Sequence, residues 1–95
     1  MAGYVIAEVD VTDPEKFEVY RGQVGATIEK YGGKYVVRGG ATETAEGSWQ
    51  PKRLIILEFE SVARAKEWYH SAEYSGPMQL RHQAANTNVV FVDGV

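Results

Sequence analysis

The sequence of 95 residues predicts an α+β fold in which four strands and two helices follow in the order β-α-β-β-α-β. Three observations predict it. Residues 3–11 alternate two sets of side chains, one of them wholly apolar, as a strand does. The residues after Asp13-Pro14 instead repeat apolar side chains at spacings of three and four, as a helix does. The run Arg53–Glu60 is apolar on both faces, which favours a central strand.

The first strand, Gly3–Val11, leads directly into the first helix. Two caps are compatible with the residues between them. Either Asp13 caps the helix with Pro14 in its first turn, or Thr12 caps it in a box with Glu15. Both alternatives place the start of the helix within the same few residues.

The middle of the chain supplies two further strands and a long connection. Gly32-Gly33 ends the first helix, because a left-handed cap favours glycine. Lys34–Arg38 is the second strand and Arg53–Glu60 the third. Residues 39–51 between them are polar and without period, much longer than a hairpin loop, which indicates a functional or interface arm.

The last part predicts one clear helix, an irregular segment and a strand. Ser61 can cap the second helix. Ser71–Ala85 reads as irregular because Gly76-Pro77 interrupts it, with a short helix over residues 78–83. Asn88–Val92 is the fourth strand. The whole chain, residues 1–95, is expected to form one domain.

This order of elements is the split βαβ, ferredoxin-like pattern. It predicts an antiparallel sheet of strand order 4-1-3-2 with both helices on one face. The other face would remain open and largely apolar, with the fourth strand contributing either Val90 and Val92 or Val89 and Phe91. The remaining residues expected there are Tyr4, Ile6, Glu8, Lys34, Val36, Arg38, Leu54, Ile56 and Glu58. A second copy of the sheet is the simplest cover, which predicts a homodimer.

Even pairing of the strands predicts which polar residues meet on the open face. Lys34 would lie opposite Glu58, and Arg38 opposite Leu54. On the other side of the third strand, Tyr4 would approach Glu58. A carboxylate and a guanidinium would then share an otherwise apolar surface.

Glu58 and Arg38 are therefore the candidate catalytic residues. Glu58 on an apolar face can act as a general base or acid, or can be a structural carboxylate neutralised by Lys34. Arg38 can anchor an anionic substrate, or can pair with Glu8 or Glu46. Sequence alone leaves both pairs of alternatives open.

Aromatic residues and one arginine complete the predicted site. Trp49 lies in the long connection, where an indole is expected to contact a partner subunit or close a pocket. Tyr4, Tyr74 and Arg81 are the other candidate ligand-binding residues. His70 and His82 lack the spacing of a metal site and read as surface residues, with haem ligation as an alternative.

Composition excludes several function classes. The net charge of −3 and the absence of basic blocks argue against nucleic-acid binding. No apolar stretch has the length of a membrane span, and no signal peptide is visible, so a cytoplasmic protein is expected. Without cysteine there is no thiolate nucleophile or iron–sulfur cluster. We expect no cofactor and no metal.

Short motifs are distributed along nearly the whole chain: Asp13-Pro14, Tyr31-Gly32-Gly33, residues 37–40, 46–51 and 57–59, Ala65, Trp68-Tyr69, residues 71–74 and Arg81. The pattern resembles the domain-of-unknown-function family numbered 1330, in the dimeric α/β-barrel superfamily. The resemblance implies a ferredoxin-like protomer and a homodimer, but no particular reaction. The wider superfamily includes cofactor-free monooxygenases, lactone isomerases, haem-degrading enzymes and ligand-binding regulatory domains.

Two functional hypotheses follow. In the first, a pocket takes a small, anionic, partly apolar molecule for a proton transfer or isomerisation without metal, with Arg38 as anchor and Glu58 as proton acceptor. In the second, the protein is a non-enzymatic ligand-binding or stress-associated dimer whose charged residues serve the interface. The sequence does not identify the ligand or the reaction.

Overall fold

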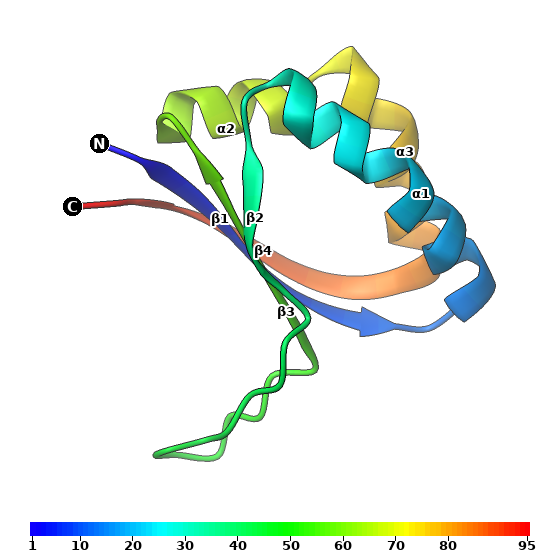
Figure 1. Cartoon of the computed structure of the whole chain (residues 1–95). Coiled ribbons are helices and arrows are strands. Elements are labelled where there is room, and N and C mark those ends of the chain that lie inside the picture. The colour runs from blue at the N-terminus through cyan, green and yellow to red at the C-terminus, as the bar shows by residue number, and fades with distance from the viewer.

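The computed structural model describes residues 1–95 and contains four strands and three helices. In chain order they are β1 (Gly3–Val11), α1 (Pro14–Lys30), β2 (Lys34–Arg38), β3 (Arg53–Phe59), α2 (Val62–Tyr69), α3 (Ala72–Ala84) and β4 (Ala85–Asp93). The strands form one antiparallel sheet of order β2-β3-β1-β4, which confirms the predicted ferredoxin-like order. All three helices lie on one side of this curved sheet (Figure 1).

Helix caps follow the sequence signals. The carboxylate of Asp13 accepts a hydrogen bond from the backbone N–H of Lys16 at 3.2 Å, and Pro14 occupies the first turn, so Asp13 rather than Thr12 caps α1. Ser61 caps α2 in the same way, with its hydroxyl accepting from the N–H of Arg64. Both caps satisfy amide groups that would otherwise have no partner in the first helical turn.

The irregular segment predicted for residues 71–85 is instead the continuous helix α3, which contains Pro77, and the short helix predicted over residues 78–83 is its second half. A proline inside a helix lacks the N–H that would donate to the carbonyl four residues earlier, here that of Glu73, and its ring crowds that carbonyl. Ser71 caps the helix, and the buried Tyr74 and Arg81 anchor it on both sides of the proline. Tertiary packing therefore outweighs the local cost of Gly76-Pro77.

Pairing between β2 and β3 contains a bulge at Val36. Lys34 lies opposite Glu58 as predicted, but Val37 lies opposite Ile56 and Arg38 opposite Ile55. One extra residue on β2 changes the face to which every later residue points. Arg38 is thus on the helix-facing side rather than on the open face, and its predicted pairing with Leu54 was wrong.

The other registers agree with the prediction. Tyr4 lies opposite Glu58 and Glu8 opposite Leu54. On β4, Val89 and Phe91 pack toward the helices, while Val90 is 54% exposed on the open face. This register resolves the parity of the fourth strand, which extends over Ala85–Asp93 rather than only Asn88–Val92.

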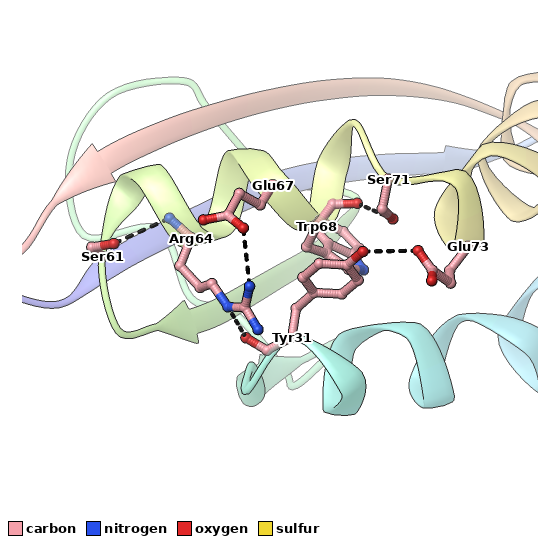
Figure 2. Close-up of polar contacts among 7 residues, drawn as sticks. All are labelled: Tyr31, Ser61, Arg64, Glu67, Trp68, Ser71 and Glu73. Carbon is pink, nitrogen blue, oxygen red and sulfur yellow. Dashed lines mark hydrogen bonds and ion pairs between the residues drawn. The ribbon is translucent and has the colours of Figure 1, made fainter.

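Polar contacts fix the ends of the helices to one another (Figure 2). Arg64 on α2 donates from Nε to the carbonyl of Tyr31 at 3.1 Å, and the Tyr31 hydroxyl donates to Glu73 at 2.8 Å. Lys30 pairs with the same carboxylate. These contacts join the last turn of α1 to α2 and to the first turn of α3.

Residues 39–52, here called the arm, extend from the sheet on the side away from the helices (Figure 1). The indole Nε1 of Trp49 donates to the Glu8 carboxylate at 3.0 Å, although Trp49 is 61% exposed. Asn88 is a second donor to Glu8, at 3.4 Å. The arm therefore attaches to the open face of the sheet. None of the helices combines the length and apolar character that crossing a membrane requires.

Candidate ligand-binding site

A cavity of about 290 Å³ lies between α1 and the helix-facing side of the sheet. Its apolar floor comes from the alternating residues of β1 and β3, and its roof from one stripe of α1. The lining includes Val5, Ala7, Val9, Ile55 and Leu57 below, Phe17, Tyr20, Val24 and Ile28 above, and Trp68, Tyr69 and Tyr74 at the side. A cavity of about 150 Å³ already holds benzene, so this one has room for a ring with a substituent.

Trp68 is held rigidly as a wall of the cavity. Its Nε1 donates to the hydroxyl of Thr27 at 3.0 Å, and that hydroxyl donates to the carbonyl of Val24 at 2.7 Å. The rings of Trp68 and Tyr74 have centroids 4.2 Å apart. Since both side chains are almost fully buried, the aromatic wall is part of the core as well as of the cavity.

A chain of hydrogen bonds connects Arg81 to the cavity roof. Arg81 donates from Nε to the Tyr74 hydroxyl at 3.2 Å, and the hydroxyls of Tyr74 and Tyr20 lie 2.8 Å apart. The other end of Arg81 donates to Thr87 on β4. Arg81 is only 4% exposed and has no carboxylate partner, so its charge is compensated by hydroxyl oxygens alone.

Burial keeps two tyrosines of the cavity, Tyr20 and Tyr35, in their neutral, proton-bearing form. It raises the pKa of Tyr20, and the neighbouring Tyr74 raises it further. Burial also raises the pKa of Tyr35, while Arg38 opposes that shift. Burial by itself would lower the pKa of Arg81, but the adjacent Tyr74 and Tyr20 reverse the direction. These groups therefore act as hydrogen-bond donors near neutral pH.

Two further guanidinium groups line the cavity at the β2–β3 side. The Cζ atom of Arg38 lies 4.9 Å from the ring centroid of Tyr35, and that of Arg53 lies 5.9 Å from the centroid of Phe17. Neither arginine forms an ion pair, and the buried Nε of Arg53 has no hydrogen-bond partner. Arg21, also at the cavity, is paired with Glu18 at 3.2 Å.

The polar lining thus consists almost entirely of donors. Glu18 is the one carboxylate among the lining residues, and it is exposed and already paired. Nowhere in the chain do three His, Cys, Asp or Glu side chains come together as they would to hold a metal ion. An arrangement of this kind can bind an anion and stabilise negative charge that develops on an oxygen atom.

The sheet divides the residues that sequence analysis assigned to one site. Arg38, Tyr74 and Arg81 line the cavity on the helix-facing side. Glu58 lies on the open face, with its carboxylate 3.9 Å from the Nζ of Lys34. Tyr4, opposite Glu58, and Trp49, bonded to Glu8, also belong to the open face. Arg38 and Glu58 consequently do not meet in this chain.

Three cavity residues were missed by the sequence analysis: Arg53, Tyr20 and Tyr35. Arg53 was not among the candidate site residues, yet it shares its face with Ile55 and Leu57, and this parity was a usable signal. Tyr20 was recognised only as part of the buried helical stripe. Sequence gave no sign that its hydroxyl meets Tyr74, because 54 residues separate them.

His70 and His82, the alternative haem ligands, are both exposed and do not line the cavity. His70 stacks edge-on against Tyr69 at the end of α2, with ring centroids 5.2 Å apart. His70 directly follows α2, whereas His82 lies in α3.

Comparison with solved structures supports the fold. The protein of unknown function RPA0582 from Rhodopseudomonas palustris matches with a TM-score of 0.78 and 20% identity, over 99% of this chain and 82% of that one. SnoaB, a cofactor-independent oxygenase from Streptomyces nogalater, matches with a TM-score of 0.68 and 8% identity, over 99% and 93%. A putative antibiotic biosynthesis monooxygenase from Nitrosomonas europaea matches with a TM-score of 0.56 and 13% identity, over 98% and 90%. At these identities the likeness concerns the fold alone.

None of the curated proteins matches the chain. A family model, in contrast, matches residues 2–95, which is nearly the whole sequence. Its description is a domain of unknown function, DUF1330, in agreement with the resemblance seen in the sequence motifs. The chain therefore belongs to the DUF1330 family.

Proposed function

We propose that the protein binds a small, partly apolar organic anion in the cavity between α1 and the sheet. The observation that carries this proposal is the unpaired Arg38 beside an aromatic cavity. A guanidinium without a counter-charge at a largely apolar pocket favours an anionic ligand over a neutral or cationic one. The aromatic walls favour a ligand with a planar apolar part.

The reaction that fits these groups is a proton transfer in which the ligand becomes an enolate or phenolate. The proton passes to solvent water, because the one carboxylate at the cavity, Glu18, is already paired. An isomerisation would then return a proton from water to another atom of the ligand. Arginine and tyrosine donors stabilise such an oxyanion and so make the bound weak acid more acidic. SnoaB is described as a cofactor-independent oxygenase, and its shared fold is consistent with organic chemistry in a pocket of this kind. Arg38 is the proposed anion anchor, with Tyr74 and Arg81 as the polar wall.

Intrinsic fluorescence provides the test, since the chain has two tryptophans and only Trp68 lines the cavity. A Trp49→Phe variant leaves Trp68 as the sole reporter. Titration with phenylacetate should change its emission at lower concentration than titration with the neutral phenylacetamide. Arg38→Gln should weaken phenylacetate binding about tenfold or more, as expected for a lost charge-assisted hydrogen bond.

A second probe addresses the ionised state. The colour of 4-nitrophenol reports its phenolate form, and binding to the cavity should lower its apparent pKa. Unchanged Trp68 emission with both phenylacetate and 4-nitrophenol would contradict the proposed function. A raised pKa of bound 4-nitrophenol would contradict it as well. Phenylacetamide binding as tightly as phenylacetate would also contradict it.

An observation on the open face supports the homodimer that both functional hypotheses include. Ile6, Leu54 and Ile56 form an apolar centre there, and Val36 and Val90 beside them are more than half exposed. We propose that a second copy of the chain covers this face, with Glu58, Lys34, Tyr4 and Trp49 at or near the interface. In a non-enzymatic protein, these polar residues would serve the dimer rather than a reaction.

A further inference from the structure

We infer that Arg53 and Arg38 together bind the oxyanion group of a small aromatic acid, and that Gly39 sets the position of the Arg53 guanidinium. This inference rests on the proposed ligand-binding function and specifies its ligand class. It assigns a second anchoring residue and a positioning residue, neither of which belongs to the site predicted from the sequence.

The backbone brings the two arginines to the same space. Arg38 lies opposite Ile55, and Arg53 is two residues from Ile55 on β3, so both side chains rise from the same face. Such diagonal neighbours lie about 7–8 Å apart at their Cα atoms, within reach of two long side chains. Both guanidinium groups act on Tyr35: burial raises the pKa of Tyr35, and Arg38 and, more weakly, Arg53 oppose that shift.

Charge argues for an anion at this place. The two guanidinium groups repel one another, and no carboxylate of the chain pairs with either. Each also rests against an aromatic ring, Arg38 on Tyr35 and Arg53 on Phe17, which fixes its plane and leaves its N–H edges for another partner. A planar oxyanion is the partner that this fork of donors matches best.

Arg53 has one donor that the protein leaves unused. Its Nε is buried and without an acceptor, an arrangement that is rare because water cannot replace the missing bond. A small rotation of the guanidinium toward a bound oxyanion would provide that acceptor. Arg81 differs in this respect, because its Nε donates to Tyr74 and its Nη1 to Thr87.

Gly39 is the residue against which the Arg53 guanidinium packs. Its φ of +70° lies in the region that favours glycine, and its N–H donates to the Leu54 carbonyl at 2.8 Å. A Cβ at this position would lie 2.8 Å from Cζ and 2.9 Å from Nη1 of Arg53. Any side chain at position 39 must therefore displace the guanidinium. Gly40, its neighbour, has no atom within 4 Å of such a Cβ and serves as a matched control.

The cavity limits the rest of the ligand. About 290 Å³ and walls of Phe17, Tyr35 and Trp68 fit one aromatic ring with a short acidic substituent. The acid group would lie at the arginines and the ring beneath α1. Carboxylates and phosphonates share the required chemistry, so both belong in the test.

The experiment measures affinities of phenylacetate, phenylphosphonate and phenylacetamide by titration calorimetry for the wild type, Arg53→Gln, Gly39→Ala and Gly40→Ala. Arg53→Gln should weaken the binding of one or both acids about tenfold or more, and should change the affinity for the amide by no more than about twofold. Gly39→Ala should weaken the acids several-fold, and Gly40→Ala should leave them unchanged. Arg53→Lys, which keeps the charge but not the fork, should restore only part of the affinity.

The outcomes separate the inference from the proposed function. If the wild type binds neither acid, both are overturned. If the acids bind the wild type and Arg53→Gln equally, only the role of Arg53 is overturned. If Arg53→Gln loses affinity equally for the acids and the amide, Arg53 has a general structural role, and its role as an anion anchor is overturned. If Gly39→Ala behaves like Gly40→Ala, Gly39 does not position Arg53.

Discussion

Arg38 and Glu58 point to opposite faces of the sheet, although they lie on neighbouring strands. Arg38 shares the cavity with Tyr35, whereas Glu58 pairs with Lys34 on the open face. One bulge residue, Val36, creates this separation. Ligand binding and self-association are therefore assigned to different surfaces, and they can be tested by different substitutions.

Removal of the Tyr74 hydroxyl should destabilise the protein more than removal of the Tyr20 hydroxyl. Tyr74→Phe leaves the buried Nε of Arg81 without an acceptor and breaks the bond to Tyr20. An unsatisfied buried donor costs about 1–3 kcal/mol, whereas Tyr20→Phe removes one hydrogen bond worth about 1 kcal/mol. Urea denaturation of the two variants measures the difference, and equal losses would show that the bond from Arg81 contributes nothing.

Acid should remove one specific contribution to stability, that of Glu73. Hydrogen bonds from Lys30 and then Tyr31 lower the pKa of Glu73 from 4.5 to about 2. Since the folded pKa lies below the ordinary value, this contribution is complete above about pH 4.5 and is lost as the pH falls toward 2.

Glu73→Gln should accordingly be less stable than the wild type at pH 6 and equal to it near pH 2. Denaturation curves between these values measure the difference. Glu60→Gln, an exposed residue without a side-chain partner, is the control and should show no such pH dependence. A difference that is the same at every pH would refute the assignment to Glu73.

Substitution by alanine should change the stability of the protein in opposite directions at two glycines. A Cβ at Gly3 would lie 2.1 Å from the backbone nitrogen of Val62, so Gly3→Ala should cost about 3 kcal/mol or more. A Cβ at Gly25 in α1 meets nothing within 4 Å, so Gly25→Ala should stabilise the helix by about 1 kcal/mol. Thermal unfolding of the pair checks both signs, and tolerance of Gly3→Ala would contradict the close approach of α2 to β1.

A charge on the open face should disrupt the proposed self-association. Val90 on β4 and Val19 on α1 are both 54% exposed, which makes them a matched pair on opposite sides of the molecule. Val90→Glu should shift the protein toward monomer in sedimentation velocity, because a charge would be buried at the interface. Val19→Glu should not. A wild-type monomer at micromolar concentration would refute the proposal outright.

The fold could be predicted in detail because its elements carry local signals. Asp13-Pro14, Gly32-Gly33 and Ser61 mark helix ends through their own backbone preferences. Alternation in Gly3–Val11 and the apolar run in Arg53–Glu60 predicted the two central strands, and even pairing of the strands predicted that Tyr4 and Lys34 lie opposite Glu58.

The site was only half predictable, because its geometry depends on features without a local signal. Two consecutive valines, Val36 and Val37, fit a regular strand as well as a bulge, so the face of Arg38 could not be read from the pattern. Pro77 suggested a break that packing around Tyr74 and Arg81 overrides. The meeting of Tyr20 with Tyr74 depends on how α1 crosses α3, which no short segment determines.

The bulge at Val36 determines which phenotype each substitution along β2 should produce. On β3, Arg53, Ile55 and Leu57 line the cavity, whereas the even-numbered residues form the open face. A scan along that strand should therefore alternate between two phenotypes, one in ligand affinity and one in oligomer size. On β2 the alternation should change phase after Val36, since Tyr35 and Arg38 both belong to the cavity.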